Sequence, residues 1–163
     1  MRPMKSMPAA FSAALLLSGV FFLLVSGCGK DKTDADRIKA AVAEMAEGAQ
    51  SKDFAMVKKH IAKEYRDPSG NDYDALKGLM LFYFMQQPDI NIFLRRQQVE
   101  VNGDRAKMSM NAVISRGAKV SDIKDIGQAE ASGFNFDLTF ERRGGDWLLV
   151  SAVWRQVGVL EAM

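Results

Sequence analysis

The sequence of 163 residues has only one cysteine, Cys28, and only one histidine, His60. One cysteine cannot pair within the chain, which excludes an intrachain disulfide framework. Zinc and copper sites draw heavily on cysteine and histidine, so this composition predicts no metal centre. The sequence also contains no Gly-rich phosphate loop, no G-x-S-x-G elbow and no H-E-x-x-H pair. We therefore expect no bound cofactor.

An apolar run ends at the single cysteine. Arg2 and Lys5 lie near the start of the chain, an apolar stretch covers residues 9–25, and Val25-Ser26-Gly27-Cys28 closes it. A charged start, an apolar centre and small residues at the end are the layout of a secretory signal. The closing tetrapeptide resembles the lipobox of bacterial lipoproteins, which reads aliphatic, small, small, Cys. The resemblance implies that residues 1–27 are removed and that the Cys28 thiol carries a diacylglyceryl anchor with fatty acyl chains such as palmitate.

Two other interpretations of the apolar stretch stay open. It is near the length of ~20 residues that spans a bilayer as an uncleaved helix, and a plain signal peptide could be cut elsewhere. A sole cysteine at the cleavage point favours the lipoprotein. We therefore expect the bacterial cell envelope, with the membrane as partner through the lipid anchor. In a Gram-negative host we expect the outer membrane facing the periplasm, because Gly29 and not an aspartate follows Cys28.

The mature chain has no excess of either charge. The full chain has 22 basic and 20 acidic residues, and removal of Arg2 and Lys5 with the signal leaves 20 of each. This balance predicts neither a nucleic-acid partner nor an electrostatic membrane patch. The 136 residues after position 27 suit one domain with a substantial core.

Apolar residues at helical spacing predict three helices in the first half of the mature chain. Thr33 and Asp36 are placed to cap a helix from about 34 to 50. Asp53 offers a cap for a second helix from 54 to about 66, and the Pro- and Gly-containing segment 67–71 predicts a turn. A third helix is expected from 72 to just before Pro88, and its apolar segment 79–85 predicts deep burial.

After residue 89 the apolar period becomes two, which predicts strands. A switch of parity within the first strand predicts a β-bulge near 95–98. Asn102-Gly103 and Arg143-Gly144-Gly145-Asp146 predict hairpin turns. The last strand is apolar on both parities, which predicts coverage of both its faces at its centre. The expected elements are strands at 90–101, 106–115, 134–141 and 147–157, a loop or irregular extension at 117–132 and a fraying tail at 158–163.

Helices followed by an antiparallel meander define an α+β domain. Residues 34–157 resemble the NTF2-like superfamily, which includes nuclear transport factor 2, ketosteroid isomerase and polyketide cyclases. The residues that carry this resemblance are Ser51-Lys52-Asp53 between the first two helices, Gly103-Asp104-Arg105-Ala106, Phe136-Asp137-Leu138-Thr139-Phe140-Glu141-Arg142 and Gly145-Asp146-Trp147. It implies N-terminal helices packed on a curved, cone-shaped antiparallel sheet, between a tether at 28–33 and a tail at 158–163. Members often pair through the outer face of the sheet, so it also implies a homodimer as one assembly.

Enzymes of this superfamily place an acid–base group in a pocket, and isomerase members use a carboxylate. Asp137 is the best acidic candidate, because an apolar pocket would suit it to proton abstraction. Its parity, however, is that of Asn135, Thr139 and Glu141, on the face opposite an apolar row. That pattern favours an ordinary hydrated face. We therefore predict that Asp137 is not a catalytic base.

The other candidates are aromatic residues, methionines and the histidine. Tyr83 and Trp154 could each present a polar group to a ligand, although amphipathic packing is the simpler interpretation. His60 lies between lysines, which predicts the solvated flank of a helix, and no carboxylate–histidine spacing is visible in the sequence. The ten methionines fit core packing better than a metal site. The residues expected to line a pocket or to pack in the core are Met80, Tyr83, Phe84, Met108, Met110 and Trp154.

Two functions compete for this sequence. The first is a non-catalytic envelope lipoprotein whose domain binds a small apolar ligand or an envelope protein. The second is an envelope-tethered enzyme of isomerase or cyclase type that uses a pocket carboxylate, with Asp137 or Tyr83 pointing inward. The sequence favours the first, because it contains no evident acid–base pair.

Overall fold

The computed structural model describes residues 32–86, 89–117, 122–126 and 130–163. The predicted signal, Cys28 and the tether up to residue 31 lie outside these residues. None of the helices in the described ranges is long and apolar enough to cross a membrane. The elements are α1 Asp34–Gln50, α2 Phe54–Lys58, α3 Tyr73–Gln86, β1 Ile90–Asn102, β2 Arg105–Arg116, the short 3-10 helix η1 Ile123–Ile126, β3 Glu130–Arg143, β4 Asp146–Val157 and α4 Val159–Ala162.

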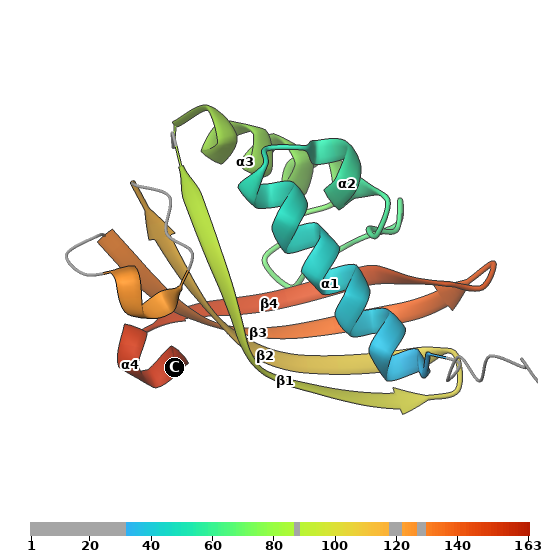
Figure 1. The fold of residues 1–163 in the computed structure, drawn as a ribbon. Helices are drawn as coiled ribbons and strands as arrows, with labels where there is room; N and C mark the ends of the chain where they lie inside the picture. Colours follow the sequence, from blue (N-terminus) through green and yellow to red (C-terminus); the bar gives the residue numbers. More distant parts are fainter. Residues whose placement is uncertain (1–31, 87–88, 118–121, 127–129) are drawn as a thin grey trace, which may run out of the picture. The chain divides into compact units, whose positions relative to one another are not determined.

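The four strands form one antiparallel sheet in the order β1-β2-β3-β4. Both predicted hairpin turns are confirmed, and Gly103, Gly144 and Gly145 adopt positive φ there. The predicted bulge in β1 is also confirmed, since the register with β2 shifts between Arg95 and Gln98. The sheet is visibly bent along its strands (Figure 1).

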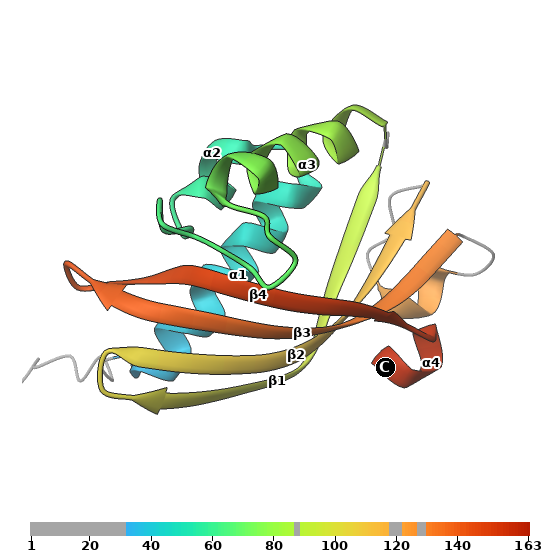
Figure 2. The ribbon, with the colours of Figure 1, turned by 180° about the vertical axis from the view of Figure 1, so that it is seen from behind.

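Helices α1, α2 and α3 lie on one side of this sheet, and α4 lies on the other (Figures 1 and 2). The predicted start of α1 is confirmed, because Thr33 and Asp36 form a capping box. Helix α1 is tied to the β3–β4 hairpin through Asp34, which accepts hydrogen bonds from Arg142 Nη2 at 2.7 Å and Trp147 Nε1 at 3.1 Å. The main core lies between the helices and the sheet and includes Ile38, Val42, Tyr65, Met108, Leu138, Phe140 and Leu149.

The second helix is shorter than predicted and ends at Lys58. The following residues run beside β4 instead: Ala62 N donates to Leu149 O at 2.9 Å, and Arg66 N donates to Val150 O at 3.0 Å. Pairing with the edge strand satisfies backbone groups of both segments and buries Ile61 and Tyr65. A helical apolar spacing and this bridged segment cannot be told apart from the sequence.

Strand β4 is not covered on both faces, contrary to the prediction. Its register with β3 shifts between Thr139 and Phe140, so one extra residue of β4 is inserted. A bulge exchanges the two faces of a strand, which explains why both Leu149 and Ala152 are buried while Val153 is 48% exposed. The bulge therefore accounts for the apolar residues at both parities of β4.

The end of the chain is ordered as a helix, in contrast to the predicted frayed tail. Ala162 of α4 is fully buried, and with Val113, Ile123 and Ile126 it forms a second core cluster on the outer face of the sheet. Gly133 permits this packing, since a Cβ there would lie 2.6 Å from the Gly158 carbonyl oxygen and 2.8 Å from Ala162 Cβ. Strand β3 also begins earlier than predicted, at Glu130, within the segment expected to be a loop.

Candidate functional site

Helix α3 differs most from its sequence-based prediction, because only Phe84 of its segment 79–85 is buried. Leu76, Met80 and Phe84 recur four residues apart and face the core. No described part of the chain covers the other faces of the helix in the same way, and there Met85 is 88% and Phe82 is 54% exposed. We call Leu79, Leu81, Phe82, Tyr83 and Met85 the α3 apolar surface. Contiguous exposed apolar side chains of this kind mark interaction sites.

Four lysines surround a pocket at the N-terminal half of the same helix. This lysine cluster consists of Lys58, Lys59, Lys63 and Lys77, and the pocket of about 390 Å³ is completed by Phe54, Tyr73 and Asp74. Lys63 Nζ lies 4.0 Å from the centroid of the Tyr73 ring, in a cation–π contact. Apart from Lys59, no member of the cluster forms an ion pair with any residue that the structure describes.

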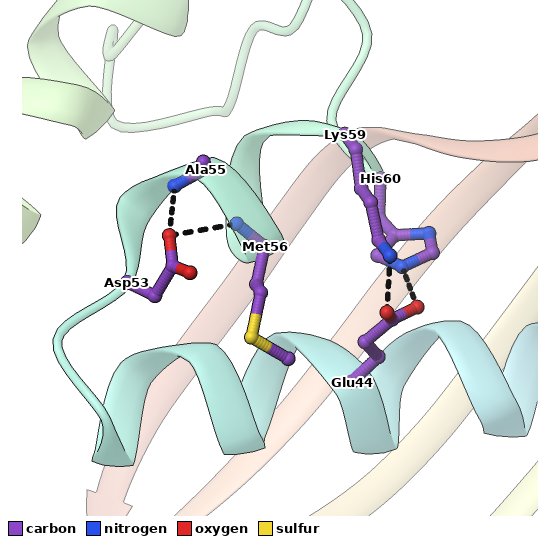
Figure 3. A network of polar contacts seen from close by, with 6 residues as sticks. All are labelled: Glu44, Asp53, Ala55, Met56, Lys59 and His60. Carbon is purple, nitrogen blue, oxygen red and sulfur yellow. Dashed lines mark hydrogen bonds and ion pairs between the residues drawn. The ribbon is translucent and has the colours of Figure 1, made fainter.

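Two side chains from the segment after α2 contact one carboxylate on α1 (Figure 3). Lys59 Nζ contacts Glu44 Oε1, and His60 Nε2 lies 2.7 Å from Glu44 Oε2. Hydrogen bonds from Lys59 and then from His60 lower the pKa of Glu44. Asp53 fixes the start of the intervening helix α2 by accepting from the backbone N–H groups of Ala55 and Met56.

The Glu44–His60 pair borders a second pocket, of about 490 Å³, between α1 and the β3–β4 turn. Its lining includes Lys32, Arg37, Asp146 and Trp147. A carboxylate that orients an imidazole beside a pocket can support proton transfer. Lys59 shares the same carboxylate, however, so Glu44 is already engaged in an ion pair with a lysine.

The residues predicted to line a pocket do not all come together. Met108 and Met110 are buried in the main core, and the partly buried Met80 packs against that core. Tyr83 and Trp154 are 45% and 36% exposed.

The predicted acid, Asp137, lies on the face of β3 opposite the buried Leu138. It is exposed, and Ser109 Oγ donates a hydrogen bond to Asp137 Oδ1 at 2.8 Å across the neighbouring strand. This is the polar face that the alternation in β3 predicts.

Sequence reasoning missed the Glu44–His60 pair and the lysine cluster. Glu44 and His60 are 16 residues apart, and the turn at 51–53 folds α2 back beside α1 to join them. The break at Ser51-Lys52-Asp53 signals that turn but not which side chains meet across it. Among the residues that the structure describes, no three His, Cys, Asp or Glu side chains are grouped to hold a metal.

Neither a family model nor a curated protein sequence matches this chain. Solved structures do match its fold. A candidate dehydratase from the NTF2-like family of Streptomyces avermitilis is 18% identical, with a TM-score of 0.64 over 76% of this chain and 97% of that one. A candidate scytalone dehydratase from Novosphingobium aromaticivorans is 9% identical, with a TM-score of 0.63 over 74% and 82% of the two chains.

A hexachlorocyclohexane dehydrochlorinase, LinA-type3, from Novosphingobium barchaimii is 12% identical, with a TM-score of 0.60 over 74% of this chain and 84% of that one. Identities this low establish likeness of fold alone. The helices packed on a curved four-stranded antiparallel sheet are the shared feature.

Proposed function

We propose that this chain, whose fold is the NTF2-like α+β fold, is a lipid-anchored protein of the bacterial cell envelope that binds a partner through the α3 apolar surface without catalysing a reaction. The exposed run of α3 carries the binding half of the proposal. The lipobox-like Val25-Ser26-Gly27-Cys28 carries the anchoring half. The outer membrane, facing the periplasm, and a homodimer stay predictions.

The geometry of α3 favours a partner with an extended apolar surface over a small enclosed ligand. Sites for small molecules are concave and surround most of the ligand. The α3 apolar surface is the outward side of a helix, with Phe82 and Met85 more than half exposed. A helix face of this kind suits recognition across a broad contact area.

A binding test of this surface uses the apolar dye 1-anilinonaphthalene-8-sulfonate with the folded protein. We expect the double variant Phe82→Ser, Met85→Ser to bind less dye. Its free energy of unfolding should stay within about 0.5 kcal/mol of the parent value, as is usual for exposed positions. Val153→Ser is the matched control, because Val153 is an exposed apolar residue on the outer face of β4. Equal dye binding by the double variant and the parent would contradict the proposal.

The anchoring half is tested at Cys28. Cys28→Ser removes the sulfur that would carry the diacylglyceryl group, so we expect loss of palmitate labelling and release from membranes or failure of cleavage. Density-gradient fractionation of the parent protein then reports which membrane holds it. A Cys28→Ser protein that matures at the same site and stays bound in high salt would contradict the anchor.

The Glu44–His60 pair is the observation that supports a second candidate function, an envelope-tethered enzyme. Several structural neighbours are named as dehydratases or a dehydrochlorinase. A catalytic role would need His60 to exchange protons with a substrate in the adjoining pocket of about 490 Å³. His60→Gln keeps a polar side chain there, so a dehydration or elimination activity that disappears in this variant, with folding unchanged, would favour the enzyme.

A further inference from the structure

We propose that the α3 apolar surface and the lysine cluster together form a docking surface for an anionic phospholipid bilayer. The inference rests on the proposed function in taking α3 as the binding surface, and it names the partner. It adds the lysines, which the binding argument above does not use.

The two features occupy one continuous stretch of the molecule. Lys77 is itself on α3, and Leu81 and Met85 follow it at intervals of four residues, so the three share a helix face. At a rise of 1.5 Å per residue, Lys77 and Met85 are separated by about 12 Å along the axis. Lys63 is joined to the first turn of α3 through the ring of Tyr73. One flat surface can therefore contact Lys77, Leu81 and Met85 at once.

The outward face of α3 is free of obstruction by other described parts of the chain. A Cβ built on Gly78, midway along this face, would meet no atom within 4 Å. Helices α2 and α3 lie next to each other on the helical side of the sheet, as both ribbon views show (Figures 1 and 2). The lysines of α2 and the following segment thus extend the surface sideways.

The chemistry of this surface matches the membrane interface. Leucine, phenylalanine and methionine enter the boundary between headgroups and acyl chains, and lysines beside them bind anionic headgroups. Lys58, Lys63 and Lys77 have no carboxylate partner in the described structure, so their charge is available. Asp74 is the one acidic side chain lining their pocket.

The anchor makes a bilayer the nearest large apolar partner. Five residues, 29–33, separate Cys28 from α1. A chain of that length extends no further than about 20 Å, so an anchored domain stays close to the membrane. An acidic envelope protein with an apolar patch would also complement the surface. The proposed anchor, however, holds the domain close to the bilayer and not to such a protein.

The test places a fluorescent probe on α3 in the mature, lipidated protein. Cys28 is the only cysteine, and its sulfur is occupied by lipid, so Phe82→Cys provides the single reactive thiol for an NBD label. The labelled protein is reconstituted in phosphatidylcholine vesicles with and without phosphatidylglycerol, each containing doxyl-labelled lipid as quencher. Val153→Cys is the matched control on the outer face of β4.

We expect quenching at position 82 in the phosphatidylglycerol vesicles and little at position 153. Substituting Lys58→Gln, Lys63→Gln and Lys77→Gln together should reduce the ratio of docked to undocked protein on the order of a hundredfold, since each lysine near an anionic surface contributes about fivefold. The same vesicles without phosphatidylglycerol should show a similar loss.

Protein that floats with the vesicles but shows no quenching at position 82 overturns the bilayer docking, leaves the anchor standing and assigns α3 to a protein partner. Equal quenching at positions 82 and 153 also overturns it, because the contact is then not specific to α3. Protein that fails to float at all contradicts both the anchor and the docking. Circular dichroism melting of each variant confirms that the fold is retained.

Discussion

Two helical glycines, Gly48 in α1 and Gly78 in α3, have opposite surroundings. A Cβ on Gly48 would lie 2.8 Å from Met56 Cβ and 2.9 Å from Val57 Cγ2, whereas one on Gly78 would meet nothing within 4 Å. We expect Gly48→Ala to lower the free energy of unfolding by about 1–3 kcal/mol through overpacking. Gly78→Ala should raise it by up to about 1 kcal/mol, because alanine is the better helix former. Urea denaturation of both variants measures this, and a change of the same sign in both would be inconsistent with the close contact of α1 and α2.

A buried carboxylate organises the turn at residues 67–71. Asp67 Oδ1 accepts from the backbone N–H groups of Ser69 and Asn71, both at 2.9 Å, and Oδ2 accepts from Asn71 Nδ2 at 2.9 Å and the Tyr65 hydroxyl at 3.3 Å. Burial opposes ionisation of Asp67, but the hydrogen bonds from Asn71, Ser69 and Tyr65 outweigh it and lower its pKa.

Asp67→Asn should therefore be destabilising at neutral pH. The amide presents an N–H₂ group where the carboxylate had an acceptor, which leaves two donors facing each other. We expect a loss of about 1–3 kcal/mol in the free energy of unfolding, the usual cost of an unsatisfied buried group. Guanidinium titration at pH 7 measures it. Asp137→Asn is the control, because Asp137 is exposed, and an equal loss there would contradict the role given to burial.

At the scale of elements, the two faces of the short helix α4 differ sharply in exposure. Ala162 is fully buried, and Leu160 is 87% exposed. Ala162→Glu forces a charge into the cluster with Val113, Ile123 and Ile126, so we expect a loss of several kcal/mol, or detachment of α4 from the sheet. Leu160→Glu should change stability by no more than about 0.5 kcal/mol.

Thermal unfolding followed by circular dichroism compares these two variants. Amide hydrogen exchange at Val113 shows whether α4 has detached. If both variants melt like the parent, the packing of α4 on the sheet contributes no stability, and the tail is as loose as the sequence predicted.

At the scale of the whole domain, the ionisable groups predict a stability plateau around neutral pH. The carboxyl groups of Asp34, Asp36, Glu44, Asp67 and Glu141 all have lowered pKa values. A folded pKa below the unfolded one contributes stability that is present above the unfolded pKa of about 4 and is lost as the pH falls through the folded value. The acid side of the profile should therefore descend below about pH 4.

The alkaline side of the profile depends on Tyr65. Burial, followed by the nearby Asp67 carboxylate, raises the pKa of its phenol above the ordinary value. A raised folded pKa contributes stability that is present below the unfolded pKa of about 10 and is lost as the pH rises beyond it. Denaturant titrations between about pH 2 and pH 11, which bracket the ordinary carboxyl and tyrosine pKa values, give the free energy of unfolding on both limbs. Tyr65→Phe should flatten the alkaline limb and leave the acid limb in place; the reverse pattern would contradict this assignment.

Net charge, a property of the whole molecule, did not reveal where the charges lie. Without the predicted signal, residues 1–27, the chain is formally neutral, which predicted no electrostatic membrane patch. Folding brings Lys58, Lys59, Lys63 and Lys77 around one pocket, since α2, the segment after it and α3 converge there. A balanced total is therefore compatible with a locally positive surface.

The sequence by itself determined the features that depend on neighbours a few residues apart. The capping box of Thr33 and Asp36, the glycine turns of both hairpins and the alternation in β2 and β3 are local, because the groups that interact are at most four residues apart or repeat along one strand. The resemblance to the NTF2-like superfamily used this same order of elements, and the structural neighbours bear out the fold.

Only the tertiary structure decided which apolar residues stay exposed and which polar ones meet. The apolar run of α3 predicted burial, but burial requires a second element over each face, and within the described ranges α3 receives cover on one face alone. The Glu44–His60 pair joins residues 16 apart, and the Asp34–Trp147 hydrogen bond joins residues 113 apart. Such contacts depend on how α1, α2 and the sheet pack in three dimensions, and no local pattern in the chain encodes that packing.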